Sequence, residues 1–305
     1  MILKEKRILI IDSNSIIHRA YHALPPLRTK KGEIVNAVYG FFSILIKNVK
    51  EIKPTHIVAA FDLPKPTFRH QICQEYKAKR PPTPQDLINQ FAVVRKGLKA
   101  LDIPILAKEG FEADDLIGSV ARIVSRQDNQ KSIILSGDKD NLQLIDSTTT
   151  VSLLQKGIKD VLRYDLIKVE NDYQGLKPSQ LIDLKALEGD QSDNISGVPG
   201  IGRKTAIDLI KKFHNLEEIY NTIQKKPAEI SPTTISKLSK NQDRAFLSKE
   251  LVTIQTGLSL DGFNLNQSLW KGFESNHFME FLKEIGFKAL IKRLTETKKS
   301  NLSLF

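Results

Sequence analysis

The stretch Arg7–Asp12, RILIID, is a short run of mostly β-branched apolar residues that stops at an acid. Three more segments repeat this form, with acids at or just past the end of the apolar run: Thr55–Asp62 (THIVAAFD), Asp102–Asp115 (DIPILAKEGFEADD) and Lys131–Asp140 (KSIILSGDKD). Continuous apolar runs of this length are typical of strands buried on both faces, as in a parallel sheet. The four segments therefore predict strands of one sheet.

Helical periodicity separates these strands along the chain, over roughly Ala37–Glu51, Pro84–Leu101 and Ala113–Gln127. Strands that alternate with helices favour an open α/β sheet. We therefore expect an α/β fold with a mostly parallel central sheet flanked by helices.

In open α/β sheets the ligand site lies beyond the carboxyl ends of the strands. Every run above places its acids at that end, so seven carboxylates should converge on one edge: Asp12, Asp62, Glu112, Asp114, Asp115, Asp138 and Asp140. Like charges this close repel one another unless they are protonated or a cation neutralises them. Oxygen ligands without cysteine or histidine favour Mg²⁺ or Mn²⁺ over Zn²⁺. The pattern therefore predicts a divalent-metal site.

A simpler interpretation exists for each acid taken alone. An aspartate after a strand is commonly a turn residue or a helix N-cap, and an acidic first turn gains about 0.3–1 kcal/mol per charge from the helix dipole. This explains one such segment well and four poorly. We therefore expect Asp114 and Asp115 to serve the metal rather than the cap, so that Asp115→Asn would cost far more activity than stability.

The chain as a whole is basic. Its 305 residues carry 46 Lys+Arg against 35 Asp+Glu, a formal charge of +11, which fits a polyanionic partner, nucleic acid first and a membrane surface second. The longest mostly apolar run, Ala37–Ile46, is too short to span a bilayer, and the first residues do not resemble a signal peptide. The single cysteine, Cys73, excludes an internal disulfide and a cysteine zinc site. A cytoplasmic protein is expected.

A basic segment bounded by prolines, Leu63–Pro84, begins directly after Asp62. It holds five cations against one acid: Lys65, Arg69, Lys77, Lys79 and Arg80. A helix here would align Arg69, Cys73, Tyr76 and Arg80 on one face. Cations beside an aromatic ring suit a nucleic-acid backbone with base stacking, although a solvated surface helix is the commoner role of such a run. Its position at the rim of the acidic cleft favours a phosphate-holding element.

Residues Leu181–Phe213 have the pattern of a helix-hairpin-helix. Helical patterns at 181–187 and 203–213 flank GVPGIGRKTA (197–206), whose glycines permit a tight hairpin with backbone N–H groups exposed at a helix N-terminus. Such a hairpin binds a phosphate backbone without reading its sequence. The predicted DNA contacts are Gly197, Val198, Gly200, Ile201, Gly202, Arg203, Lys204 and Thr205. Just upstream, Asp190 and Asp193 would join the acidic cleft if the hairpin packs against the sheet edge.

Two other phosphate-binding motifs do not fit this stretch. A P-loop requires lysine directly after its last glycine, whereas Arg203 intervenes here. A dinucleotide fingerprint requires G-x-G-x-x-G after a strand, whereas the order here is G-x-x-G-x-G after a helix.

Together the motifs resemble the 5′ nuclease (flap endonuclease) superfamily, and most closely the 5′–3′ exonuclease domain of bacterial DNA polymerase I. The matching stretches are IIDSNSIIHRAYHALPPL, FDLPKPTFRHQICQEYKAKRPPTP, GFEADDLIG, SGDKDNLQLI and EGDQSDNISGVPGIGRKTA. They run in family order to about residue 290. Two departures are Ser136, where close relatives have threonine, and Ser196, where they have proline; neither removes a charge.

The resemblance implies a PIN-like nuclease core that binds two Mg²⁺ or Mn²⁺ ions. It implies nine metal ligands: Asp12, Asp62, Glu112, Asp114, Asp115, Asp138, Asp140, Asp190 and Asp193. It places Arg69, Tyr76, Lys77 and Arg80 in an arch near the scissile phosphate. It also implies a K⁺ ion at the helix-hairpin-helix.

The sequence therefore predicts a structure-specific 5′–3′ exonuclease and 5′-flap endonuclease that acts by a two-metal mechanism in primer removal and DNA repair. Its expected partner is DNA with 5′ flaps, nicks or RNA-primed ends, together with a DNA polymerase. A monomer in the nucleoid, without a membrane, is expected. The alternative is a DNA-binding protein with an inactive nuclease cleft. A magnesium-dependent phosphatase is disfavoured, because DSNS (12–15) lacks the second aspartate of D-x-D.

Three regions are expected along the chain. Residues 1–175 would form the nuclease core with the arch at 63–84. Residues 176–293 would form a helical DNA-binding region with the helix-hairpin-helix at 181–213, and residues 294–305 a flexible tail.

Overall fold

The computed structural model describes residues 5–302, with side chains to residue 296, and is built around one six-stranded sheet. The strand order is β3-β2-β1-β4-β5-β6. All neighbours pair in parallel except β5 with β6. The strands are β1 (Lys6–Asp12), β2 (His56–Ala60), β3 (Ile105–Leu106), β4 (Gln130–Ser136), β5 (Thr149–Leu154) and β6 (Val161–Tyr164). The predicted mostly parallel α/β sheet is confirmed, and β1 to β4 lie in the four segments that predicted it.

Alternate residues of the central strand β1 enter two different cores, because successive side chains of a strand point to opposite faces. Ile8 and Ile10 pack with α5 (Ala113–Ser125) on one face. Leu9 and Ile11 pack on the other face with a second set of helices. That set is α1 (Ser13–Ala23), α2 (Asn36–Ile52), α4 (Gln85–Ala100), α12 (Asn276–Glu284) and α13 (Lys288–Leu302).

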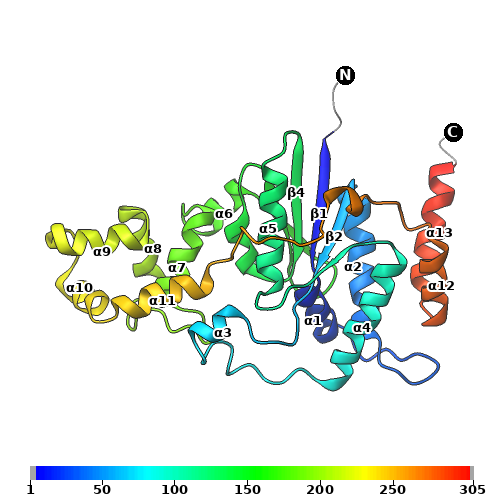
Figure 1. The fold of residues 1–305 in the computed structure, drawn as a ribbon, viewed down its shortest axis with the longest axis horizontal. Helices are drawn as coiled ribbons and strands as arrows, with labels where there is room; N and C mark the ends of the chain where they lie inside the picture. The colour runs from blue at the N-terminus through cyan, green and yellow to red at the C-terminus, as the bar shows by residue number, and fades with distance from the viewer. Residues whose placement is uncertain (1–4, 303–305) are drawn as a thin grey trace.

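The remaining helices extend to one side of the sheet, on the left in Figure 1. They are α6 (Leu166–Asp172), α7 (Leu181–Glu188), α8 (Arg203–Phe213), α9 (Leu216–Lys225), α10 (Pro232–Ser239) and α11 (Gln242–Val252). Their apolar side chains continue the core under α5 without a break. Short 3₁₀ turns lie at Lys139–Leu144, Pro178–Gln180, Pro227–Glu229 and Leu265–Ser268.

The helix expected through the proline-bounded basic segment is wrong beyond its first turn. Helix α3 covers only Phe68–Ile72, and turns follow it. Lys77 has a φ of 56°, in the left-handed region that a helix excludes. Arg69, Tyr76 and Arg80 therefore do not share a helical face.

The C-terminal part of the chain returns to the nuclease core. The 3₁₀ turn at Leu265–Ser268 lies beside β2, and α12 packs on α4. The region expected to be a DNA-binding unit at 176–293 therefore contributes its C-terminal part, from Leu265 onward, to the cover of the sheet. The expected tail is helical as far as Leu302, and residues 303–305 lie outside the described part. Within residues 5–302, no helix is both long and apolar enough to cross a membrane.

Gly97 in α4 marks the closest approach of three helices on this face. A Cβ at this position would lie 2.3 Å from Cζ of Phe42 in α2 and 2.7 Å from Cε1 of Phe281 in α12. We expect Gly97→Ala to lower the free energy of unfolding by about 1–3 kcal/mol through overpacking, measured by urea denaturation. Lys99→Ala, on the exposed side of the same helix, should change it by less than about 0.5 kcal/mol. Equal stability of the two variants would contradict this packing.

Candidate active site

Acidic side chains gather where the parallel strands end. Asp12 is the last residue of β1 and caps α1, and its Oδ1 accepts a hydrogen bond from the Ser15 N–H (3.2 Å). Asp62 follows β2, and its Oδ1 accepts one from the Ala113 N–H (2.7 Å) at the start of α5. Asp138 follows β4 and caps the next 3₁₀ turn. The crossover topology thus brings four distant segments to one edge, as predicted.

Eight of the nine predicted ligands line three cavities that share several of these acids. One cavity of about 540 Å³ lies between α1 and the proline-bounded segment, and another of about 500 Å³ lies beside α7. A third, of about 20 Å³, joins the two groups of acids. The eight are Asp12, Asp62, Glu112, Asp114, Asp138, Asp140, Asp190 and Asp193. Asp115 lines none of the three.

Three neutral side chains that the sequence analysis did not single out as site residues orient the acids. The Ser136 hydroxyl donates to Asp12 Oδ2 (2.5 Å) and lies 3.3 Å from the Ser15 hydroxyl. Asn141 Nδ2 donates to Asp114 Oδ1 (3.0 Å). Ser136 and Asn141 lie in the SGDKDN stretch (136–141) and Ser15 lies in DSNS (12–15). Hydroxyl and amide residues beside acids are common in turns, so neither stretch identified these three as site residues.

Burial and neighbouring charges raise the pKa of Asp12, Asp114 and Asp140. Burial, aided by the charge of Asp138, raises the pKa of Asp12 to about 6 despite hydrogen bonds from Ser136 and Ser15. Burial, followed by the charges of Asp12 and Asp138, raises the pKa of Asp114 well above its usual range. Burial and then Asp138 raise the pKa of Asp140 to about 7. A bound cation would relieve this cost, and all the donors are the carboxylate oxygens that a hard divalent ion prefers.

Protein cations hold several of the same acids. Lys77 Nζ contacts Glu112 Oε1 (2.8 Å), and Arg80 pairs with Asp193. Lys185 contacts both Asp140 and Asp190. In this arrangement no three or more Asp, Glu, His or Cys side chains of the described residues form a group that could hold a metal ion.

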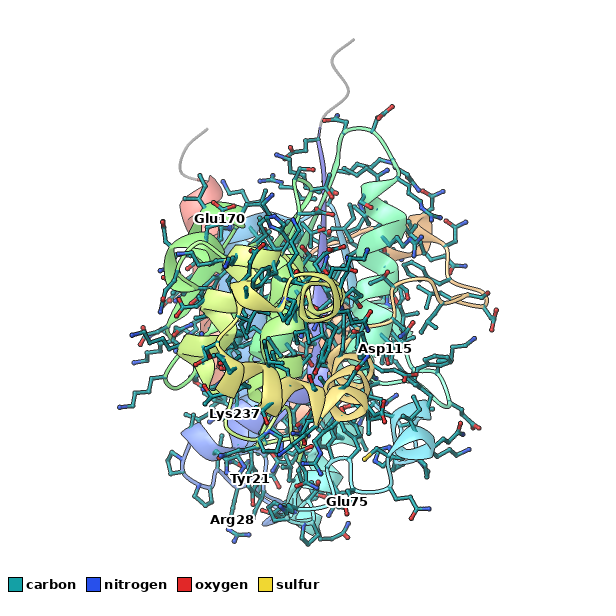
Figure 2. The ribbon with its side chains drawn as sticks, turned by 90° about the vertical axis from the view of Figure 1, so that its left-hand side faces the viewer. Tyr21, Arg28, Glu75, Asp115, Glu170 and Lys237 are labelled. Atoms are coloured by element: carbon teal, nitrogen blue, oxygen red, sulfur yellow. The ribbon has the colours of Figure 1, made fainter. Side chains whose placement is uncertain are left out.

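The structure sets Asp115 apart from the other eight predicted metal ligands, and its role as a ligand stays a prediction. Asp115 is fully buried inside the molecule (Figure 2). Its two oxygens accept from Arg69 (both 2.8 Å), and they also accept the N–H groups of Glu112 (3.0 Å) and Gln255 (2.9 Å). The bond from the Glu112 N–H is part of the capping box of α5. Asp115 therefore serves the helix cap and a buried ion pair.

Two predicted arch residues are likewise structural. Arg69 is 2% exposed, and besides Asp115 it donates to the backbone carbonyls of Leu251 (2.8 Å) and Thr253 (2.9 Å). Tyr76 is 3% exposed, and its hydroxyl donates to Glu112 Oε2 (3.1 Å). Both side chains line only the third cavity of about 20 Å³ and already have partners among the acids, so their predicted contact with a phosphate stays a prediction. Lys77 and Arg80 remain at the rim of the cavities.

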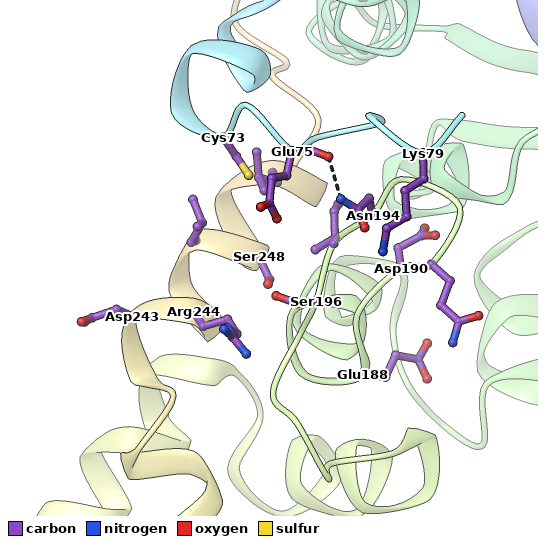
Figure 3. A pocket seen from close by; sticks show the side chains of 14 residues that line it. Cys73, Glu75, Lys79, Glu188, Asp190, Asn194, Ser196, Asp243, Arg244 and Ser248 are labelled. Atoms are coloured by element: carbon purple, nitrogen blue, oxygen red, sulfur yellow. Dashed lines mark hydrogen bonds between the residues drawn. The ribbon is translucent and has the colours of Figure 1, made fainter. Parts of the chain in front are cut away.

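The segment after α3 is tied to the loop that carries the second group of acids. Figure 3 shows Asn194 Nδ2 donating to the Glu75 carbonyl (2.8 Å). The Lys77 N–H donates to the Asp193 carbonyl (2.9 Å). Lys77 and Asn194 both have a φ of 56°. The two loops therefore position each other.

The predicted hairpin between α7 and α8 divides into a buried and an exposed part. Val198 and Ile201 are buried in the core, so their side chains hold the hairpin in place. Gly200, Gly202, Arg203 and Lys204 are exposed. Gly200 has a φ of +80°, and its carbonyl accepts from Lys237 Nζ (2.9 Å) in α10 (Figure 2).

The sheet with the helices beside it has the fold of solved nuclease structures, including the T5 5′-exonuclease. The T5 5′-exonuclease with divalent metal ions (zinc) bound aligns with a TM-score of 0.66 and 22% identity, over 92% of this chain and 98% of that one. The catalytic core of Rad2 in complex with DNA substrate aligns with a TM-score of 0.59 and 20% identity, over 93% and 88%. At these identities the likeness shows the fold.

Sequence comparison identifies the family. Residues 7–174 match the "5'-3' exonuclease, N-terminal resolvase-like domain" and residues 176–276 match the "5'-3' exonuclease, C-terminal SAM fold". The chain is 42% identical over 294 residues to DNA polymerase I of Bacillus subtilis (strain 168) and 39% identical over 290 residues to that of Bacillus caldotenax. These matches cover 96% and 95% of this chain. The chain belongs to the 5′–3′ exonuclease family, and the predicted resemblance is confirmed. It spans about a third of the length of these polymerases.

Removal of the Asp115 charge should unfold the protein rather than silence a metal site. Asp115→Asn leaves the buried Arg69 guanidinium without its counter-ion, and we expect a loss of about 3–5 kcal/mol in the free energy of unfolding. Urea denaturation without divalent ions measures it. Asp172→Asn, which breaks an exposed pair with Lys168 (2.7 Å), should cost less than about 1 kcal/mol. A fully stable but inactive Asp115→Asn variant would support the metal-ligand interpretation.

Removal of the Asp12 charge should stabilise the protein at high pH, in contrast to removal of the Asp115 charge. Its pKa is raised from 3.8 to about 6 on folding, so its contribution to stability is complete below pH 3.8 and is lost as the pH rises through 6. Without divalent ions we expect Asp12→Asn to be more stable than wild type at pH 8, by on the order of 2 kcal/mol, and to lose that advantage near pH 4. Urea denaturation at both pH values tests this. A variant that is less stable at pH 8 would contradict it.

Proposed function

We propose that this chain is a structure-specific 5′–3′ exonuclease and 5′-flap endonuclease that hydrolyses DNA phosphodiester bonds with two divalent ions. The observation that carries this proposal is the set of eight carboxylates that line three adjoining cavities at the sheet edge, because so many negative charges this close together call for a cation. The family membership and the exposed hairpin support it. Primer removal and repair, a place in the nucleoid and a monomeric state belong to the same proposal.

The carboxylates fall into two groups that would each hold one Mg²⁺ or Mn²⁺ ion. Asp12, Asp62, Glu112, Asp114 and Asp138 would form the first group. Asp140, Asp190 and Asp193 would form the second. When bound, such ions supply an activated water and stabilise the leaving oxygen in an in-line displacement. Ser136 and Asn141 keep Asp12 and Asp114 oriented by hydrogen bonds that do not depend on the ions.

The basic residues of the cleft rim would hold the DNA strand. Arg80 is half exposed and Lys77 is 22% exposed, and both line the larger cavity of the first group. A phosphate in that cavity would offer these cations an alternative partner to Asp193 and Glu112, so we assign them to stabilising phosphate charge. Arg69 and Tyr76 act through these neighbours as positioning residues.

The exposed face of the hairpin would hold the duplex. The N-terminus of α8 presents its first N–H groups beside Gly202, where a phosphate binds favourably. Lys204 adds a charge to this face without affecting base preference. The carbonyl of Gly200 already accepts the Lys237 ammonium, and we include a K⁺ ion at the hairpin only as part of the proposal. Partnership with a DNA polymerase would follow from the relatives in which this region forms one third of the chain.

Cleavage of a labelled 5′-flap duplex tests the function. We expect short oligonucleotides with Mg²⁺ and none with excess EDTA. Asp138→Ala should lower the rate by two orders of magnitude or more, about 3 kcal/mol in barrier, while DNA binding by gel shift stays within a few-fold of wild type. The matched control, Asp261→Ala, removes an exposed acid paired with Lys108 (2.8 Å) and should cleave normally. If wild type and Asp138→Ala bind DNA equally and neither cleaves, the chain is a DNA-binding protein with an inactive cleft.

A further inference from the structure

Lys185 lies between two carboxylates of the second group. It is in the last turn of α7, and its ammonium contacts Asp140 Oδ1 and, at 2.6 Å, Asp190 Oδ2. The side chain is 22% exposed, and the two acids are 20% and 15% exposed. Asp140 belongs to the turn after β4, and Asp190 to the loop before the hairpin. One lysine therefore joins two segments that sequence separates by 50 residues.

The charges of this cluster are strongly coupled. Burial alone would raise the pKa of Asp190, but Lys185 and Ser192 outweigh it and lower that pKa to about 2. The two acids raise the pKa of Lys185 although burial opposes this. The third acid of the group, Asp193, is held from the other side by Arg80. Every acid of the second group thus has a protein cation as its partner.

We infer that Lys185 is an internal counter-ion that the second divalent ion must displace. This inference deepens the proposed function and rests on it. Lys185 keeps Asp140 and Asp190 together without a metal, and it competes with the ion for the same oxygens. It thereby sets the affinity of the second site below that of the first.

The Lys185 ammonium competes with a divalent ion for the oxygens of Asp140 and Asp190. It has three donors and no lone pair, so it cannot act as a ligand. Two cations about 4 Å apart also repel each other at the effective dielectric constant of a protein interior. The cavity of about 500 Å³ beside α7 is lined by Lys185, Glu188 and Arg203, and it provides space for the ammonium to leave. Glu188 lies one helical turn further along and offers it a new carboxylate.

The test is a titration of the protein alone with Mn²⁺, in which the electron paramagnetic resonance signal of free Mn²⁺ measures how much of the ion is unbound. We expect Lys185→Met to tighten the weaker of the two dissociation constants about tenfold and to leave the tighter one within about threefold. An unchanged or weaker second site in Lys185→Met would overturn the inference, because it would show that the lysine organises the site without competing for it.

Lys249 provides a matched control in the same helical region. Its ammonium bridges Asp183 (2.7 Å) and Glu217 (2.6 Å), and its side chain is 23% exposed. These acids line none of the three cavities of the active site. Lys249→Met should therefore leave both Mn²⁺ constants unchanged. A tightening equal to that of Lys185→Met would attribute the effect to net charge and overturn the inference.

A measurement on wild type covers the case in which Lys185→Met does not fold. Lysines are reductively methylated with ¹³C, and the Lys185 signal is assigned by its absence in Lys185→Arg. We expect Mg²⁺ to shift this signal as the ammonium leaves the carboxylates, while the Lys249 signal stays. No shift at saturating Mg²⁺ would overturn the inference. If wild type binds no Mn²⁺ or Mg²⁺ at all, the proposed function fails instead, so the two failures are distinguishable.

Discussion

The constraint on which this structure depends is the crowding of negative charge at the carboxyl edge of its sheet. Four parallel strands end in acids, and a fifth segment adds Asp190 and Asp193. Burial, and after it the charge of Asp138, raises the pKa of Asp12 and of Asp140. The chain limits the cost of this crowding with hydrogen bonds from Ser136 and Asn141 and with cations from other segments.

Those cations also organise the tertiary structure. Arg69 reaches from the segment after β2 to Asp115 at the start of α5 and to two carbonyls at the C-terminal end of α11, those of Leu251 and Thr253. One buried side chain thereby joins three parts of the chain. Lys185 and Arg80 do the same at the more exposed second group. The Arg69–Asp115 pair is enclosed and holds the structure together, whereas the pairs of Lys185 and Arg80 are partly exposed, and we propose that these exchange their partners for an ion or a phosphate.

The sequence predicted the sheet well because its evidence is local. The apolar run Ile8–Ile11 and the helical periodicity of α5 reflect which neighbouring residues are buried. Such patterns are visible in the sequence itself. The strands β5 and β6 were not predicted; in the antiparallel strand β6 the exposed residues at 162–163 carry no such pattern. The basic segment was predicted as one helix because its cations have helical spacing. Its backbone instead follows the loop at Asp193, and that long-range contact holds Lys77 in the left-handed region.

The sequence by itself determined the fold class, the family and the set of acids at the sheet edge, since parallel strands that end in acids must bring those acids together. Only the tertiary structure decided which acids face a cavity. Glu112, Asp114 and Asp115 lie within four residues, yet a helix points successive side chains about 100° apart. The same geometry that turns Asp114 towards the other acids turns Asp115 towards Arg69, an ion-pair partner 46 residues away in the sequence. The partner that each side chain meets depends on packing between distant segments, which the local sequence does not determine.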